Sequence, residues 1–489
     1  MRLFVAALLA LSVHAAVVQG VVLDDETGNP LARTLVLLSP LPGTPAAALT
    51  LRTGERGAFS ILSVRPGWYT LKTSRKGFAD TEAGQLRAGR PGLPFEVTAD
   101  TQSTFVQIRM RRLPSALGSV LDENSVGIPD WPVHLYTAKK PVRRVAEIKT
   151  DDRGSFRLGA LDPGTYVVRS GAGVLDEYTS LLPTYYKYGT ALSTAESFRL
   201  RLGGTQSDTQ QDLTLRPVKG KLLEISGTLA PPYVPDTPEQ LTLITDTGRR
   251  VIAAGPGPFT ATGVPPGPVE LVAEGVRCGG YIRLLVDKDL SAVRAACLRL
   301  EPTAVDWRMT DNPRPARAYP VTARRVDLDG TGTSRPLKPG EALPPGNWEL
   351  MVEPSADYYT TSIRSPFSGE PNTRNDGWFG LYLSNQARLT VTLSSRPATL
   401  SGVVSSGGKP VAGAAVYVEL FSADGRLQLW ALRASDQGKF SLPGLAPGRY
   451  RTVSSFDFDS DDPFVMEKAV AITLKEGDVG NIAIEMNLP

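Results

Sequence analysis

The stretch Gly438-Lys-Phe-Ser-Leu-Pro-Gly-Leu-Ala-Pro-Gly-Arg-Tyr450 decides the fold, because the chain repeats its pattern along most of its length. Phe440 and Leu442 alternate with polar neighbours, which is the period-2 pattern of a half-buried strand. Pro447-Gly448 then suits the two central positions of a tight turn, since proline fixes φ and glycine tolerates positive φ. The stretch therefore predicts a hairpin whose return strand opens on Tyr450.

Related copies of this hairpin precede it in the chain. In each copy that has the phenylalanine, this residue lies seven positions before the turn proline. The turn prolines recur every 80–100 residues or so, a spacing that suits independent domains better than solenoid units. The copies are Gly57–Tyr69, Gly154–Tyr166, Gly257–Val269 and, without the phenylalanine, Leu343–Trp348.

Each full repeat begins with a strand that starts on small residues, such as Ser401-Gly-Val-Val404. Several short alternating strands per repeat, without a convincing helical pattern, predict antiparallel Greek-key β-sandwiches. The expected fold is all-β, a tandem string of about five sandwiches. The boundaries are short and lack a flexible Ser/Gly linker, so neighbouring sandwiches are expected to touch. The expected units are a signal peptide at 1–15, then sandwiches 1 to 5 at 16–113, 114–217, 218–301, 302–396 and 397–489.

The N-terminus predicts export. Met1–Ala15 places one arginine before an apolar run and ends on small residues, as secretory signal peptides do. No later stretch approaches the roughly 20 apolar residues of a membrane helix. Lys and Arg total 53 against 50 Asp and Glu, so no strong field favours nucleic acid. We expect a secreted or periplasmic protein associated with the cell envelope.

Cys278 and Cys297 are the only cysteines in the sequence. In an exported protein an isolated pair predicts one disulfide, and two buried free thiols are the alternative. A catalytic thiol is not supported, because no histidine lies nearby in the sequence.

The fifth repeat carries a resemblance to a known family. It combines Ser401-Gly-Val-Val404 with the turn Gly408-Lys-Pro-Val411 and the strand that contains Phe440. This combination resembles the carboxypeptidase regulatory-like domain, which has a transthyretin-like sandwich. The resemblance is best in repeat five, good in repeats one and two, loose in three and poor in four. Leu182–Tyr186 and Tyr358–Arg364 are also similar to segments of secreted multi-repeat proteins from acidobacteria.

The family name raises the question of peptidase chemistry, which the residues do not support. A zinc site needs His and Glu ligands, but His134 is the one histidine after the signal peptide and lies in no Glu-x-x-His pattern. A Ser-His-Asp triad would need the same histidine, and no Gly-x-Ser-x-Gly is present. We expect an accessory type of domain without enzymatic activity and without a cofactor.

Two acidic loops deserve comparison with calcium sites. Asp327-Leu-Asp-Gly-Thr-Gly332 starts like a calcium loop, but Lys338 stands where a bidentate glutamate is needed. The second loop is the better candidate, because four carboxylates could converge in it; a solvated acidic loop is the alternative. Its carboxylates belong to Asp457, Asp459, Asp461 and Asp462.

Aromatic side chains in two insertions are the remaining candidates for ligand or partner contact. Loop aromatics can stack on sugar rings or anchor a protein, and they can equally plug the end of a sandwich or a junction between sandwiches. The candidates are Tyr178, Tyr185, Tyr186 and Tyr188 in the first insertion, and Tyr358, Tyr359, Trp378 and Tyr382 in the second.

These patterns favour an exported, non-enzymatic protein that binds or spaces at the cell envelope. The expected partner is a cell-envelope protein or a glycan. An array of carbohydrate-binding modules is the alternative, supported by the tyrosine and tryptophan clusters. An accessory part of a secreted peptidase is a third hypothesis, supported by the family name alone.

Overall fold

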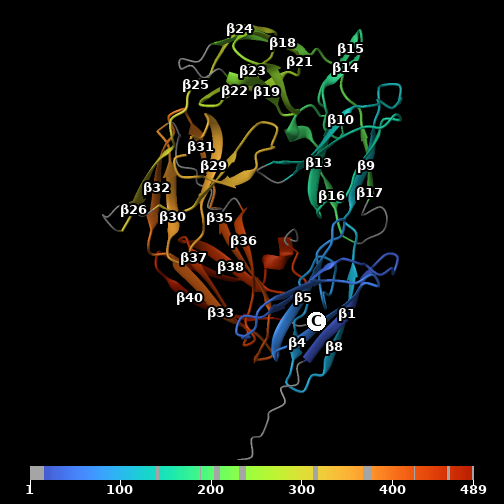
Figure 1. The fold of residues 1–489 in the computed structure, drawn as a ribbon, viewed down its shortest axis with the longest axis vertical. Helices are drawn as coiled ribbons and strands as arrows, with labels where there is room; N and C mark the ends of the chain where they lie inside the picture. Colours follow the sequence, from blue (N-terminus) through green and yellow to red (C-terminus); the bar gives the residue numbers. More distant parts are fainter. Residues whose placement is uncertain are drawn as a thin grey trace, which may run out of the picture.

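The predicted all-β fold of tandem sandwiches is confirmed (Figure 1). Each sheet takes its strands from one continuous part of the sequence. Helix is confined, within the described chain, to the short 3-10 helices η1 (Leu192–Thr194) and η2 (Pro463–Met466). The predicted signal peptide, Met1–Ala15, lies outside the described residues. A computed structural model describes residues 16–138, 142–187, 189–202, 210–230, 238–311, 318–366, 377–422, 425–459 and 463–486.

Sandwich 1 shows the arrangement that recurs. Strand β1 (Ala16–Asp24) lies between β4 (Ala58–Val64), its antiparallel partner, and β8 (Ser103–Met110), its parallel partner. The second sheet has the order β3-β2-β5-β6, with β7 also paired to β5. Alternate residues of both sheets, such as Val18 and Leu38, are fully buried and form one core. The second sheet comprises β2 (Leu35–Pro40), β3 (Leu49–Arg52), β5 (Gly67–Ser74), β6 (Thr81–Glu82) and β7 (Phe95–Val97).

Sandwich 2 repeats this plan. Strand β9 (Ser115–Val120) lies between antiparallel β12 (Ser155–Leu158) and parallel β17 (Gln210–Leu215). The facing sheet has the order β11-β10-β13-β16, and a separate hairpin joins β14 to β15. These strands are β10 (Pro132–Thr137), β11 (Arg144–Lys149), β13 (Gly164–Ser170), β14 (Gly173–Asp176), β15 (Thr179–Leu181) and β16 (Phe198–Leu200).

Sandwich 3 follows the same plan with a five-stranded second sheet. Strand β18 (Leu223–Ala230) lies between antiparallel β21 (Gly257–Val264) and parallel β24 (Leu290–Ala296). The second sheet has the order β20-β19-β22-β23-β25. Its strands are β19 (Pro238–Thr245), β20 (Gly248–Ala253), β22 (Gly267–Gly275), β23 (Cys278–Val286) and β25 (Leu298–Arg299).

Sandwich 4 departs from the plan. Strand β26 (Ala304–Met309) pairs in parallel with β32 (Arg388–Ser394), and β30 (Tyr359–Arg364) pairs with the far side of β32. No strand within the described ranges pairs with the other edge of β26, where the phenylalanine strand lies in the other sandwiches. This agrees with the missing phenylalanine of the fourth repeat. The second sheet comprises β27 (Val321–Arg325), β28 (Ser334–Pro336), β29 (Gly346–Val352) and β31 (Phe379–Leu383).

Sandwich 5 returns to the plan. Strand β33 (Ala398–Ser406) lies between antiparallel β37 (Lys439–Leu445) and parallel β40 (Val479–Glu485). The short β34 (Lys409–Pro410) pairs with the end of β33. The facing sheet, in the order β36-β35-β38-β39, comprises β35 (Ala415–Ser422), β36 (Gly425–Arg433), β38 (Gly448–Ser454) and β39 (Val470–Leu474).

The repeated glycine and phenylalanine are paired across two strands. Gly402 of β33 lies directly opposite Phe440 of β37, and a Cβ added to the glycine would come within 2.8 Å of the phenyl ring. The ring therefore lies over the glycine and fills the core, where Phe440 is buried. The same pairing occurs in three other sandwiches, as Gly20–Phe59, Gly118–Phe156 and Gly227–Phe259.

The aromatic residue after the Pro-Gly turn locks that turn. The hydroxyl of Tyr450 donates to the carbonyl of Ala446, the residue before the turn proline, over 2.6 Å. In sandwich 4, Trp348 Nε1 makes the equivalent bond to Pro344 over 2.9 Å. The recurring stretch is thus fully used by packing and turn formation. The equivalent bonds of sandwiches 1 and 2 join Tyr69 to Arg65 and Tyr166 to Asp162.

The five sandwiches close on one another and do not extend as a simple string. In Figure 1 the colours run from blue sandwich 1 through sandwiches 2, 3 and 4 to red sandwich 5, which returns beside sandwich 1. Arg433 of sandwich 5 bonds through Nη1 to the carbonyl of Gly92 in sandwich 1 over 3.0 Å and also pairs with Glu82. Leu93 of sandwich 1 packs against the core of sandwich 5.

Candidate functional site

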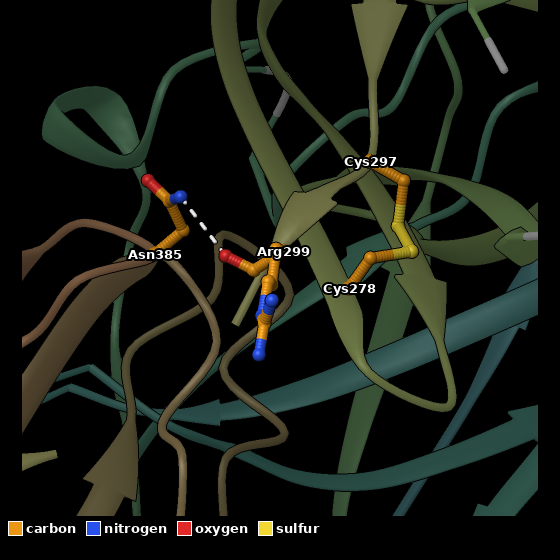
Figure 2. The surroundings of a disulfide bond; sticks show 4 residues. All are labelled: Cys278, Cys297, Arg299 and Asn385. Atoms are coloured by element: carbon orange, nitrogen blue, oxygen red, sulfur yellow. Dashed lines mark hydrogen bonds between the residues drawn. A yellow bond between two sulfur atoms is a disulfide. The ribbon is translucent and has the colours of Figure 1, made fainter. Parts of the chain in front are cut away.

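The predicted disulfide joins Cys278 and Cys297 in sandwich 3 (Figure 2). Cys278 begins β23, and Cys297 lies in the segment that passes from β24 in one sheet to β25 in the other. Both residues are buried in the core. Beside the bond, Asn385 Nδ2 of sandwich 4 donates to the carbonyl of Arg299 over 3.0 Å. The disulfide therefore fixes a segment that also contacts the next sandwich.

The predicted tyrosines of sandwich 2 do not share one surface. Tyr178 lies in the β14–β15 hairpin and is 89% exposed. Tyr185 is buried, and its hydroxyl accepts a hydrogen bond from Arg169 Nη1 over 3.3 Å. Tyr186 is half-buried and packs against the sandwich core. Tyr188 lies outside the described residues. Of the three described tyrosines, Tyr178 is the one that presents its ring to solvent.

Two of the predicted aromatics of sandwich 4 are held within that sandwich. Tyr358 is buried in the core, and its hydroxyl donates to the carbonyl of Glu353 over 2.9 Å. The guanidinium carbon of Arg324 lies 3.7 Å from the centre of the Trp378 ring, which is a close cation–π contact. Neither ring is free in the way that a ligand platform would require.

The other two aromatics of sandwich 4 reach its neighbours. The rings of Tyr382 and Tyr281, the latter in sandwich 3, have centres 5.9 Å apart. On the opposite side, the hydroxyl of Tyr359 bonds to Glu476 Oε1 of sandwich 5 over 3.3 Å. These contacts favour the interpretation that this insertion serves junctions between sandwiches.

A cleft of about 510 Å³ lies between sandwiches 4 and 5. Tyr358 and Tyr359 line it from sandwich 4, and Trp430 and Tyr450 line it from sandwich 5. The Trp430 and Tyr450 rings lie 6.2 Å apart at 40°. Its mixed aromatic and polar lining, which includes Gln428, is the composition expected of a small-ligand site.

Sequence reasoning found Tyr358 and Tyr359 of this cleft and missed Tyr450 and Trp430. Trp430 lies on β36, where it is half-buried and packs against the sandwich core. Its sequence surroundings are an ordinary alternating strand, which predicts core packing. Trp430 becomes a candidate because sandwich 4 packs close to it and forms the cleft. The sequence around Trp430 contains no pattern that predicts this packing.

The carboxylates of Asp457 and Asp459 are bound by arginines. Arg90 Nη2 of sandwich 1 lies 2.8 Å from Asp459 Oδ2, and Arg199 Nη2 of sandwich 2 lies 3.6 Å from the same oxygen. Arg87 Nη2 lies 3.3 Å from Asp457 Oδ2. Three sandwiches meet at these ion pairs, which we call the Asp459 junction.

The two remaining calcium candidates, Asp461 and Asp462, lie outside the described residues. Within the described ranges, no group of three or more His, Cys, Asp or Glu side chains is arranged to hold a metal ion. A cation at Asp459 would have to displace the guanidinium groups that now neutralise this carboxylate. The geometry thus supports use of the described carboxylates in ion pairs.

The other acidic loop forms a second meeting point of three sandwiches, the Asp329 junction. Arg249 of sandwich 3 lies 2.8 Å from Asp329 and 3.0 Å from Asp327, both in sandwich 4. Arg144 Nη2 of sandwich 2 approaches Asp329 to 4.0 Å. Burial acts to raise the pKa of Asp329, but hydrogen bonds from Arg249 and Thr331 and the charge of Arg249 outweigh it and lower the pKa.

His134 lies on β10, next to a cavity of about 470 Å³ between sandwiches 2 and 3. The side chain is 2% exposed. Burial, then the charges of Arg169 and Arg144, lower the pKa of His134 to about 3, against a small opposing effect of Asp329. No serine or cysteine occurs among the described residues that line this cavity. Two threonines, Thr245 and Thr247, do line it.

None of the helices in the described ranges is both long enough and apolar enough to cross a membrane.

The two-sheet plan, the Gly–Phe pair and the locked Pro-Gly turn define a class of modular β-sandwich proteins. The model of the carboxypeptidase regulatory-like domain matches residues 17–110, the span from β1 to the end of β8. Sandwich 1 is thus a domain of this family. Sandwich 5, for which the sequence patterns predict the strongest resemblance, lies outside the matched span but has the same arrangement, with β33 between β37 and β40. No curated protein matches the chain.

Solved structures to which the chain is similar include two pilins and one further bacterial protein. The minor pilin GBS52 of Streptococcus agalactiae is 11% identical, with 42% of this chain and 97% of that chain covered and a TM-score of 0.26. The shaft pilin SpaA from Lactobacillus rhamnosus GG is 12% identical over 43% and 99%, with a TM-score of 0.24. The Bacillus anthracis TIE protein is 10% identical over 93% and 69%, with a TM-score of 0.17. Likenesses at this level carry no argument about function.

Proposed function

We propose that this is an exported, non-enzymatic protein that acts as a structural module at the cell envelope and binds a partner there. The observation that supports it best is the use of the distinctive side chains at junctions. The acidic loop around Asp459, the acidic loop around Asp329 and the aromatic Tyr382 all contact a neighbouring sandwich. These contacts between sandwiches would hold the domains in fixed positions relative to one another.

The disulfide supports the location. Bonds between cysteines persist in oxidising compartments such as the periplasm and the extracellular space. The Cys278–Cys297 disulfide would be stable in either of these compartments. The predicted signal peptide would direct the chain out of the cytoplasm and into one of them.

Small-angle X-ray scattering of the exported chain tests the structural role. Fixed junctions predict a single compact particle whose scattering curve fits the closed arrangement of Figure 1. A curve that fits only flexible, extended strings of sandwiches would contradict the proposal. Fractionation of the producing cells tests the location, because a cytoplasmic protein would overturn export.

A second candidate function is glycan binding in the cleft between sandwiches 4 and 5. The specific observation is the presence of Trp430 and Tyr359 on opposite walls of the cleft, beside polar Gln428. Aromatic faces and a few polar groups are the usual means of binding sugar rings.

A glycan-array screen tests this second candidate. Trp430→Ala is expected to abolish retention of any glycan that the wild type holds, since it removes an aromatic face on which a sugar ring could stack. Tyr178→Ala is the matched control, because that ring is exposed on a different sandwich. No retained glycan, or equal loss in both variants, would remove the cleft as a sugar site.

A further inference from the structure

We propose that the cavity between sandwiches 2 and 3 binds a small ligand that carries carboxylate or phosphate oxyanions. The cavity of about 470 Å³ lies where two edge strands approach each other. β11 is the outermost strand of its sheet in sandwich 2, and β20 is the outermost strand of its sheet in sandwich 3. The approach is close, since a Cβ added to Gly248 of β20 would lie 3.6 Å from Arg144 Nη1 of β11.

The charge of the lining is the first reason. Each edge strand supplies two basic side chains, Arg144 and Lys149 from β11 and Arg249 and Arg250 from β20. Glu147 is the one acidic residue among the described residues that line the cavity. Guanidinium groups bind carboxylate and phosphate oxygens through paired, charge-assisted hydrogen bonds.

A buried nitrogen without a hydrogen-bond partner is the second reason. His134 lines the cavity, and its Nδ1 has no hydrogen-bond partner among the described residues. Arg144 Nη1, which is also buried, lies 2.9 Å from Glu147 Oε2 as an ion pair. A buried polar atom left unpaired costs roughly 1–3 kcal/mol, so a ligand oxygen that accepts from such a nitrogen restores that stability.

The arginines around the cavity differ in how far nearby carboxylates neutralise them. Arg249 is neutralised by Asp327 and Asp329 of sandwich 4. Arg250 instead donates to the backbone carbonyl of Thr262, and burial alone lowers its pKa. Arg250 is therefore the basic group with most capacity left for an added anion.

The size of the cavity indicates the kind of ligand. A volume of about 470 Å³ is within the range of small-molecule sites and exceeds what one inorganic ion fills. A di- or tricarboxylate or a phosphorylated small molecule would suit it. Such a ligand would rest against both sandwiches and strengthen their junction, because it is bound by residues of each.

The experiment uses the ring resonances of His134 in the exported chain, where it is the one histidine after the predicted signal peptide. Inorganic phosphate and citrate are titrated separately, with chloride at matched ionic strength as the reference. A saturable shift of the His134 signal is expected with phosphate or with citrate, and the tighter of the two identifies the class of oxyanion. Groups that face the ring and would also sense the anion are Glu147, Arg144, Arg169 and Asp329.

Variants separate the site from general charge effects. Arg250→Gln is expected to weaken the apparent affinity about tenfold or more, equivalent to one charge-assisted bond. Arg144→Gln should act in the same direction. Arg157→Gln, which removes an exposed charge on β12 of the same sandwich, should leave the affinity unchanged.

Three outcomes would contradict the proposed oxyanion site. The site is refuted if neither phosphate nor citrate gives a saturable shift in folded wild-type protein, or if chloride gives the same shift, which would mean an adventitious ion only. Equal weakening by Arg157→Gln would also overturn it. The structural role proposed above does not depend on these outcomes, because the ion pairs of Arg249 with Asp329 and of Arg90 with Asp459 need no ligand.

Discussion

Arg90 in sandwich 1 and Asp459 in sandwich 5 lie 2.8 Å apart, from Nη2 to Oδ2, although 369 residues separate them in the sequence. Their side chains are 22% and 31% exposed, so the pair is partly shielded from solvent. An ion pair of this kind contributes more than an open surface pair, since screening by water is reduced. It joins the first and last sandwiches of the chain.

Removal of this pair should loosen the Asp459 junction. Arg90→Ala is expected to weaken docking of sandwiches 1 and 5 by about 1–2 kcal/mol, because Asp457 and Asp459 each lose one of their guanidinium partners. Hydrogen–deuterium exchange should then rise around Arg90 and Asp457 and rise further in high salt, which screens the remaining pairs. Arg109→Ala, on the exposed face of β8, is the control and should change neither region. Equal exchange in both variants would contradict the junction.

Two glycines allow the effect of a steric contact between sandwiches 1 and 5 to be distinguished from the effect of backbone strain. Gly413 of sandwich 5 has φ +58, and a Cβ there would lie 2.7 Å from Leu41 Cδ1 of sandwich 1. Gly408 has φ +76 and open space around its Cβ position. Alanine strains the backbone at both sites by roughly 1–2 kcal/mol, but only Gly413→Ala also collides with sandwich 1. The unfolding temperature should therefore fall more for Gly413→Ala than for Gly408→Ala, and equal shifts would argue against close packing of these sandwiches.

The fold could be predicted because its determinants are local. The alternation around Phe440, the Pro447-Gly448 turn and the small residue at Gly402 all lie within one repeat and recur. The parallel pairing of first and last strands was not predicted, since no short pattern distinguishes a parallel from an antiparallel neighbour in this position. The closed arrangement was missed for a related reason. It depends on pairs such as Arg90 and Asp459, whose spacing in the sequence carries no signal.

The candidate sites show the same limit. Asp457 and Asp459 were recognisable as clustered carboxylates, but the arginines that face them come from two other sandwiches. Tyr178 and Tyr185 look alike in the sequence, yet one is exposed and the other is buried beside Arg169. Sequence patterns identified residues of unusual chemistry, and the approach of other sandwiches determined how that chemistry is used.

The disulfide should matter for sandwich 3 specifically. Its closed loop spans 19 positions, for which loss of chain entropy in the unfolded state predicts a stabilisation of about 3 kcal/mol. Replacement of both Cys278 and Cys297 by alanine should therefore lower the unfolding temperature of that sandwich in calorimetry. Mass spectrometry of the secreted protein should find no free thiol before reduction. Two free thiols would refute the bond.

The pH dependence of stability should carry a contribution from His134. Its pKa of about 3 in the folded state lies below the value of about 6.5 in the unfolded chain. Between these values the unfolded chain binds the extra proton, so the free energy of unfolding rises with pH across this window and falls on acidification. One pKa unit corresponds to about 1.4 kcal/mol, so the effect should be measurable.

Denaturant titrations of wild type and His134→Gln from pH 7 to pH 4 isolate this contribution. Carboxylates titrate in both proteins, whereas the histidine titrates in one. The wild-type curve should fall more steeply as the pH is lowered, and parallel curves would show that His134 is not buried in its neutral form.

The pairing of the first strand with the last has a mechanical consequence. In four sandwiches these two strands run in parallel and side by side, as β1 does with β8 and β33 with β40. In sandwich 3 the parallel partner of the first strand is β24, which the short β25 follows. The chain consequently enters a sandwich at one end of this strand pair and leaves at the other end. A pulling force along the chain would load the whole ladder of hydrogen bonds between the two strands in shear, so that many bonds must break together. Under tension the chain would first lose its junctions and gain length, while each sandwich stayed folded.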